Sequence, residues 1–194
     1  NGESYFQEVP MVKITTAAAP SMQVQSAKGN FNLKGLEDYV IWTDKTDSAI
    51  SLTNDELVFA GYGVVAPEYN WNDYEGLDVK GKVVLMLVND PGFNAGDSSL
   101  FKGKTMTYYG RWTYKFEEAA KQGAKGCLII HNTEAASYPF KVVQNNWNTS
   151  RLRLDNRGKE ETLCDVIGWV SGSTAQKLLT AAGTDSTLLS KADV

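Results

Sequence analysis

Residues 57–92 read LVFAGYGVVAPEYNWNDYEGLDVKGKVVLMLVNDPG, and this stretch decides the fold. Two apolar runs, 57–65 and 82–88, flank a polar and aromatic loop. Both runs are rich in β-branched and aromatic residues, which favour strands that are covered on both faces. The first run is broken at Pro67, and the second stops before Pro91, which cannot donate a ladder hydrogen bond. The stretch therefore predicts two buried strands joined by an irregular surface loop.

The chain that follows predicts a helix and a third buried strand. After a loop at 93–104, apolar residues recur at three- and four-residue steps, which indicates a helix over 111–122. The residues of this apolar stripe are Tyr109, Trp112, Phe116, Ala119, Ala120 and Gly123. The run GCLII at 126–130 reads as a buried strand. Strand 82–88, the helix and strand 126–130 together predict a β-α-β unit with parallel strands and a right-handed crossover.

The N-terminal part of the chain predicts short strands. The segment SYFQEVPMVKIT is expected to form a strand in which Phe6, Val9 and Met11 face inward. Three further segments, MQVQ, DYVIW and AISLT, alternate with polar sequence that is rich in turn-forming residues. They predict antiparallel strands or meanders between residues 21 and 56.

The C-terminal part predicts a last strand and a second helix. The run LCDVIGWV at 163–170 is the strand, and Ser173 with Gln176 three residues later has the spacing of a capping box. The buried side of this helix is predicted to contain Leu178, Leu179 and Ala182, and Gly183 to close it. A short further helix is expected from 185 toward 191. In all, we predict one mixed α and β domain with a β-rich, barrel-like core, two or three helices and one β-α-β unit.

Composition narrows the class of protein. The 194 residues are 42% hydrophobic and 22% charged, which suits one globular domain with an adequate core. The formal charge of −4 argues against a general nucleic-acid binder, which needs a basic face. No apolar run reaches the length of a membrane-spanning helix. The sequence opens at Asn1 without a charged and apolar leader, so we expect either a removed signal or, as we favour, a fragment of a longer protein.

Motifs for catalysis or nucleotide binding are weak. A catalytic zinc needs several histidine or carboxylate ligands, but the sequence has one histidine, His131, and neither HExxH nor GxSxG. GYGVVA at 61–66 satisfies the loose GxGxxG/A pattern, yet Pro67 follows where a phosphate site needs a helix. We therefore predict that these glycines serve a bulge or close strand packing. His131 is expected to make ordinary hydrogen bonds at a strand end.

Two charged stretches are candidates for binding sites. Asp73, Glu75 and Asp78 offer oxygen ligands, but their spacing does not match an EF-hand loop. We expect a solvated loop with one carboxylate capping a turn. The run RLRLDNRGKEE at 151–161 is expected to be a solvated face rather than a binding patch.

The two cysteines leave two alternatives open. Cys127 and Cys164 both fall in predicted strands. They are either two buried free thiols or one disulfide between neighbouring strands, which an exported protein would permit.

Three collinear blocks resemble the protease-associated (PA) domain of secreted bacterial zinc aminopeptidases, in the superfamily of glutamate carboxypeptidase and the transferrin receptor. The blocks are GYGVVAPEYNWNDYEGLDVKGKVVLMLVNDPG, TYYGRWTYKFEEAAKQGAKGCLIIH and TEAASYPFKVVQNNW. The resemblance implies the swivelling β/β/α fold, with residues 21–183 as the PA domain. It also implies that residues 1–20 and 184–194 are flanks that lead from and back to a peptidase domain.

The resemblance further implies a function for the chain. It would be a non-catalytic accessory domain that covers the active site of a secreted or periplasmic metallopeptidase and modulates substrate access or protein contacts. Its partners would be the peptidase domain of the same polypeptide and peptide substrates at the domain border. No cofactor is expected in this chain, since the zinc ligands would belong to the missing catalytic domain.

Aromatic residues in the loops suggest where that contact lies. In the assembled peptidase, Tyr108, Gly110 and Arg111 are the expected border of the cleft, with Trp71 and Tyr74 as further contacts. Two rival functions remain from the residues alone. One is a free-standing carbohydrate- or peptide-binding module that uses exposed aromatics, and the other is an independent hydrolase.

Overall fold

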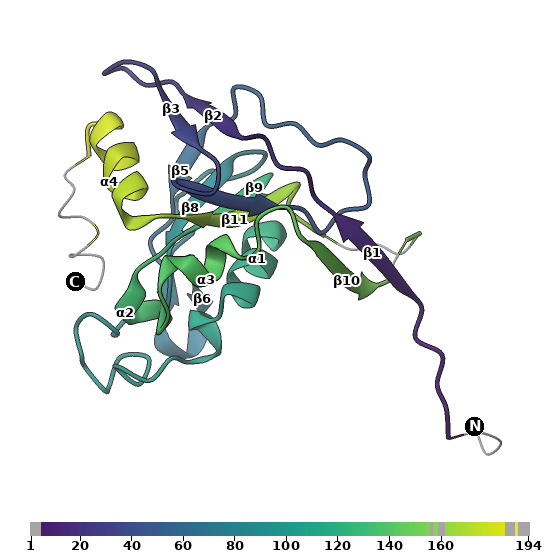
Figure 1. Cartoon of the computed structure of the whole chain (residues 1–194). Helices are drawn as coiled ribbons and strands as arrows, with labels where there is room; N and C mark the ends of the chain where they lie inside the picture. Colours follow the sequence, from purple (N-terminus) through teal and green to yellow (C-terminus); the bar gives the residue numbers. More distant parts are fainter. Residues whose placement is uncertain (1–4, 156, 159–161, 185–188, 190–194) are drawn as a thin grey trace.

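The centre of the protein is a five-stranded mixed sheet, seen in a computed structural model that describes residues 5–155, 157–158, 162–184 and 189 (Figure 1). The order across the sheet is β4 (Tyr39–Trp42), β11 (Val166–Val170), β9 (Gly126–Ile130), β8 (Val83–Leu87) and β5 (Leu57–Phe59). The last four strands run parallel, and β4 pairs antiparallel with β11 at one edge.

Shorter elements surround this sheet. Three two-stranded sheets are β1 (Met11–Thr15) with β10 (Ser150–Leu154), β2 (Ser21–Val24) with β3 (Phe31–Lys34), and β6 (Val65–Ala66) with β7 (Trp71–Asn72). The α-helices are α1 (Trp112–Lys121), α2 (Thr133–Ala136), α3 (Phe140–Gln144) and α4 (Gly172–Ala181). Two 3₁₀ turns, η1 (Pro67–Tyr69) and η2 (Tyr108–Gly110), lie in the long connections. The mixed fold is confirmed, but the five-stranded sheet of the described residues is open at β4 and β5 and forms no barrel.

The predicted β-α-β unit is confirmed in its elements and its parallel pairing. Strands β8 and β9 are adjacent and parallel, and α1 lies between them in the chain. Every residue of β8, β9 and β11 is buried, because helices and loops cover both faces of the parallel strands. On one face, Val84 and Met86 join a core with Phe116 of α1. On the other, Leu85 joins a second core with Leu178 of α4.

The first apolar run is shorter than predicted. It forms β5 and contributes only Val65 to β6, because the chain turns at Gly61 and Gly63, whose φ angles are 51° and 64°. A side chain at Gly63 would place its Cβ 2.6 Å from Sδ of Met86. The glycines therefore serve close packing against β8, as we predicted, and a 3₁₀ turn at Pro67–Tyr69 follows them instead of the α-helix that a phosphate site needs.

The N-terminal prediction was wrong in orientation. Phe6 is 92% exposed, and Val9 and Met11 are exposed as well. The strand begins later than expected, at Met11, and it pairs with β10 rather than with the central sheet. We call this pair the β1–β10 ribbon. Of the other N-terminal predictions, AISLT forms no strand, whereas the unpredicted β3 does.

The first four residues of the charged run, 151–154, belong to strand β10 and are not a uniformly solvated face, whereas residues 156 and 159–161 of the run lie outside the described residues. In β10, Leu152 is 67% exposed and Leu154 is exposed too, while Arg151 and Arg153 are half-buried against the molecule. The leucines thus point away from the core and the arginines toward it. This inverts the usual arrangement of apolar and charged residues on a strand.

The C-terminal helix has a different cap from the one predicted. The side chain of Ser171, not Ser173, accepts the hydrogen bond from the backbone N–H of Thr174 at 3.2 Å. Leu178 and Leu179 are buried as predicted, whereas Ala182 is exposed. The short helix predicted from 185 toward 191 falls, except for Leu189, outside the described residues.

Gly168 in β11 gives the sharpest packing prediction. A Cβ at this position would lie 2.2 Å from the carbonyl oxygen of Val40 in β4, so Gly168→Ala must push two paired strands apart. We expect a loss of about 3 kcal/mol in the free energy of unfolding, measured with urea. Gly76→Ala is the control: its Cβ would meet nothing within 4 Å, and only its φ of 74° opposes a side chain, at about 1 kcal/mol. Equal losses in the two variants would contradict the packing argument.

Candidate interdomain contact surface

The segment before α1 presents two of the predicted border residues to solvent. Tyr108 is 58% exposed, and Arg111, which precedes the first residue of α1, is exposed as well. Met106, two residues before Tyr108, is also exposed, although the sequence analysis did not identify it. We call Met106, Tyr108 and Arg111 the contact surface.

A buried turn after β8 positions this surface. The carboxylate of Asp90 accepts hydrogen bonds from the backbone N–H of Thr107 at 2.7 Å and from its hydroxyl at 2.5 Å. The side chain of Asn89 donates to the carbonyl oxygen of Ala135 at 2.8 Å and accepts from the N–H of Asp90 at 2.9 Å. Both residues are buried. Thr107 in turn caps η2, so the contact surface is held by the end of a central strand.

A cluster of aromatic rings holds the same surface from the other side. Tyr109 makes edge contacts with Phe101 at 5.8 Å and with Tyr114 at 5.1 Å between ring centroids. Tyr69 stacks on Phe101 at 4.2 Å, which brings in the loop around η1. The hydroxyl of Tyr109 donates to Glu68 at 2.5 Å, and this bond raises the pKa of Tyr109 to about 12. Three separate segments are thus joined into one rigid unit.

Three predicted contact residues do not lie on an open surface. Tyr74 is almost fully buried and belongs to the core, and Gly110 is buried with Met106 beside it. Trp71 is half-buried, and its ring makes an edge contact with Phe101 at 5.7 Å. The sequence could not distinguish the buried aromatic residues from the exposed ones, because all of them lie in segments that were predicted to be loops.

Lys115 is a buried charge that the sequence did not reveal. It lies on α1 and is fully buried, and its ammonium group donates to the carbonyl oxygen of Tyr62 at 2.5 Å. Burial lowers the pKa of Lys115 to about 8, although the charges of Asp73 and Asp90 oppose this shift. Burial likewise raises the pKa of Asp73, whose carboxylate accepts from the N–H of Val64 at 2.9 Å. Of the predicted acidic loop, Asp78 is exposed and caps a turn by accepting from the backbone N–H of Lys80 at 3.3 Å, whereas Asp73 is partly buried and bonds to a distant segment.

His131 has the structural role that was predicted. It follows β9, and its Nε2 lies 3.0 Å from the carbonyl oxygen of Tyr138. Its ring packs against Phe140 and Trp169 at 5.3 and 6.0 Å. Burial lowers the pKa of the imidazole, so the neutral form is favoured.

The cysteines are free, so the alternative of a disulfide between Cys127 and Cys164 is not realised. Both thiols are buried. Burial raises the pKa of Cys164 to about 12 and that of Cys127 well above its usual value, which keeps both groups protonated.

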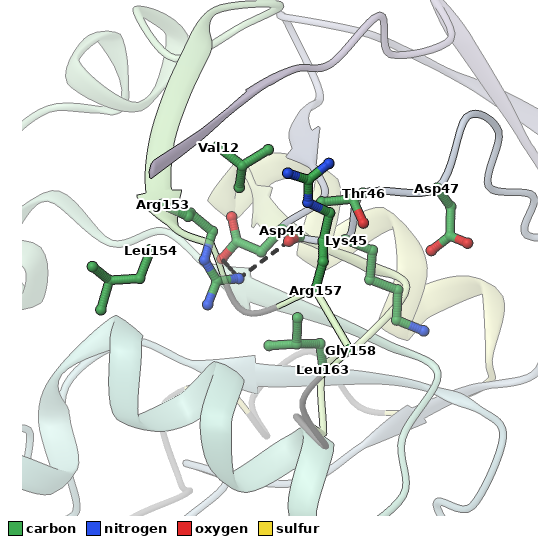
Figure 2. Close-up of a pocket in the computed structure, with 10 residues that line it drawn as sticks. All are labelled: Val12, Asp44, Lys45, Thr46, Asp47, Arg153, Leu154, Arg157, Gly158 and Leu163. Carbon is green, nitrogen blue, oxygen red and sulfur yellow. Dashed lines mark hydrogen bonds and ion pairs between the residues drawn. The ribbon is translucent and has the colours of Figure 1, made fainter. Parts of the chain in front are cut away.

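A polar pocket of about 240 Å³ lies beside the β1–β10 ribbon (Figure 2). Its charged side chains other than Asp47 form ion pairs. Arg153 pairs with Asp44 at 3.2 Å, and Arg157 pairs with Asp155 at 2.6 Å. Lys45 pairs with Asp165. The Arg153–Asp44 pair connects the ribbon to the end of β4, and the Lys45–Asp165 pair connects that end to the start of β11. We therefore regard these pairs as structural connections rather than as a ligand site.

The described residues offer neither a metal site nor a membrane-spanning helix. They contain no group of three or more His, Cys, Asp or Glu side chains placed to hold a metal ion. None of the helices within them is long and apolar enough to cross a membrane.

The replacement Lys115→Met tests the buried charge. The pKa of Lys115 is about 8 in the folded protein and near 10.5 when unfolded, so the unfolded chain binds more protons between these pH values. The cost of burying the charge is therefore complete below pH 8 and disappears as the pH rises toward 10.5. Relative to the variant, we expect the original protein to gain about 3 kcal/mol of unfolding free energy between pH 7 and 10.5, by urea denaturation.

The buried tyrosines and cysteines titrate in both proteins, so their contribution cancels in the difference between the two free energies of unfolding. Lys121→Met removes an exposed lysine from the same helix and is the matched control. A free-energy difference between original and Lys115→Met that stays constant with pH would contradict the lowered pKa.

Comparison with known proteins places the chain in a family. Residues 53–163, more than half of the chain, match the PA domain family. A search of curated proteins found no match. Among solved structures, the chain is similar to an aminopeptidase from Aneurinibacillus sp. strain AM-1, with 19% identity and a TM-score of 0.34. The similarity covers 89% of this chain but only 30% of that one, and so low a TM-score adds no support of its own. On the match of residues 53–163, the chain belongs to the PA domain family.

Proposed function

We propose that this PA domain is a non-catalytic accessory domain of a secreted zinc-dependent aminopeptidase. It lies against the peptidase domain of the same polypeptide, borders the active-site cleft and modulates the access of peptide substrates. Zinc is held by the peptidase domain and not by this chain. The proposal extends the resemblance of the three sequence blocks to such enzymes, and the contact surface supports it.

The contact surface has the chemistry of a protein interface. It combines an exposed tyrosine, an arginine and a methionine, residue types that are enriched where proteins meet. Its backbone is held by Asp90 and by the aromatic cluster, so little conformational freedom is lost when a partner binds. None of the described residues forms an ion pair with Arg111, and its planar guanidinium suits a carboxylate on the facing domain.

The first test uses the 194-residue chain alone. Because we place the reactive metal in another domain, we expect no hydrolysis of aminoacyl p-nitroanilides or peptides, with or without added zinc. The complete parent protein is the positive control. If the purified chain hydrolyses these substrates and the rate increases with added zinc, the alternative function of an independent hydrolase is favoured.

The second test uses the complete parent protein with Arg111→Glu and Tyr108→Ala. Loss of the domain contact should lower kcat/KM for a hexapeptide about tenfold, while kcat/KM for a small aminoacyl anilide stays the same. A long substrate reaches the border of the cleft, whereas the anilide does not. Lys28→Glu, a charge reversal in the exposed turn between β2 and β3, is the control. If Arg111→Glu behaves like this control on both substrates, the contact surface lies elsewhere.

A further inference from the structure

A second pocket, lined largely by aromatic and aliphatic side chains, lies beside α1. It has a volume of about 260 Å³ and lies among β4, β11, α1, α3 and β10. The residues that carry the argument are Trp42, Trp112, Trp169, Val142, Val143 and Arg151. We call it the tryptophan pocket. No prediction from the sequence identified it, because its walls come from five elements that are far apart in the chain.

The walls are rigid and preformed. Trp42, Trp169 and Val143 are nearly fully buried and form the floor. The rings of Trp42 and Trp112 both make edge contacts with Phe116, each at 5.8 Å between centroids. A pocket whose aromatic walls are already fixed loses little entropy when a ligand enters.

The rim exposes apolar surface that a ligand would cover. Trp112 and Val142 are each 45% exposed, although both lie on helices that pack on the core. Exposed tryptophan on a rigid scaffold is typical of a binding surface. The volume is below the range of sites for drug-sized molecules, so it suits one side chain rather than a chain of sugar rings.

Arg151 adds a positive charge to this apolar site. Its guanidinium carbon lies 4.2 Å from the centroid of the Trp42 ring, and its Nη2 donates to the carbonyl oxygen of Asn146 at 3.4 Å. Arg153 and Arg157 on the same segment each pair with a carboxylate, whereas none of the described carboxylates forms an ion pair with Arg151.

The partial burial of Arg151 favours the binding of an anion. The side chain is half-buried, and this desolvation lowers the pKa of the guanidinium, with Asp44 opposing the shift. A cation that has lost part of its hydration without gaining a carboxylate is stabilised when an anion arrives. The contact with Trp42 alone would tether β10 to the core, but it does not account for the open apolar volume beside it.

We propose that the tryptophan pocket binds the C-terminal residue of a peptide, with its apolar side chain against the tryptophans and its carboxylate on Arg151. A terminal residue carries its carboxylate on the Cα that also bears the side chain, so one small pocket with one cation accommodates both groups. This site lies beyond the accessory role proposed above and can be tested without the peptidase domain.

The test follows intrinsic tryptophan fluorescence of the 194-residue chain, with calorimetry as a second readout. The probes are acetyl-Ala-Phe as the free acid, the same dipeptide as the C-terminal amide, and acetyl-Ala-Ala as the free acid. We expect saturable binding of the first near a Kd of about 1 mM, and binding at least tenfold weaker for the other two. Glucose and N-acetylglucosamine serve as probes for the carbohydrate alternative.

Variants separate the charge from the apolar walls. Arg151→Gln should bind the acid and the amide with equal, weak affinity, and Arg151→Lys should retain part of the preference for the acid. Trp112→Ala should weaken binding of the Phe acid without loss of fold, which its melting temperature checks. Arg157→Gln, an exposed arginine outside this pocket, is the control and should bind like the original protein.

The results decide the proposal in either direction. Preference for the free acid that disappears in Arg151→Gln supports it. Equal binding of acid and amide by the original protein, no saturable binding up to about 10 mM, or tighter binding of the sugars would each overturn it.

Discussion

The buried turn that follows β8 connects the central sheet to the contact surface. Asn89 adopts a left-handed conformation with a φ of 70°, and its amide side chain bonds both to α2 and to the next residue. Asp90 then holds Thr107 across a loop of seventeen positions. Hydrogen bonds to a carboxylate in a buried place are among the stronger ones in proteins, because water does not compete. This turn therefore holds the backbone of an exposed segment in a fixed position relative to a fully buried strand.

Lys115 shows how the same region tolerates charge in its core. The lysine lies on the helix that begins at the contact surface, and it is surrounded by Tyr62, Asp73 and Asp90. Removing one partner of such a set leaves a buried charge without compensation, which costs more than the set contributes when complete. The loops that carry Asp73 and Asp90 are therefore coupled to α1 electrostatically as well as by packing.

The β1–β10 ribbon follows a different rule from the rest of the fold. Its arginines turn inward, where Arg151 lies on Trp42 and Arg153 reaches Asp44, and its leucines turn outward. Long arginine side chains can cover apolar surface with their stems and still place the charge beside a ring or a carboxylate. The inversion places one guanidinium in the wall of an apolar pocket, a combination that neither strand pattern nor charge count indicates.

The sequence alone determined the central β-α-β unit and the family that the chain belongs to. Strands β8 and β9 and helix α1 match their predicted positions to within a residue, because a short run of branched apolar residues or a stripe at helical spacing is local information. Only the tertiary structure decided the rest. Which residues line the tryptophan pocket, which lysine is buried and which aromatics stay exposed depend on contacts between distant segments, such as the hydrogen bond from Lys115 to Tyr62 across 53 positions. The residue type determines which interactions a side chain can make. The distant segment that packs against it determines whether its neighbour is water, an aromatic ring or a carboxylate.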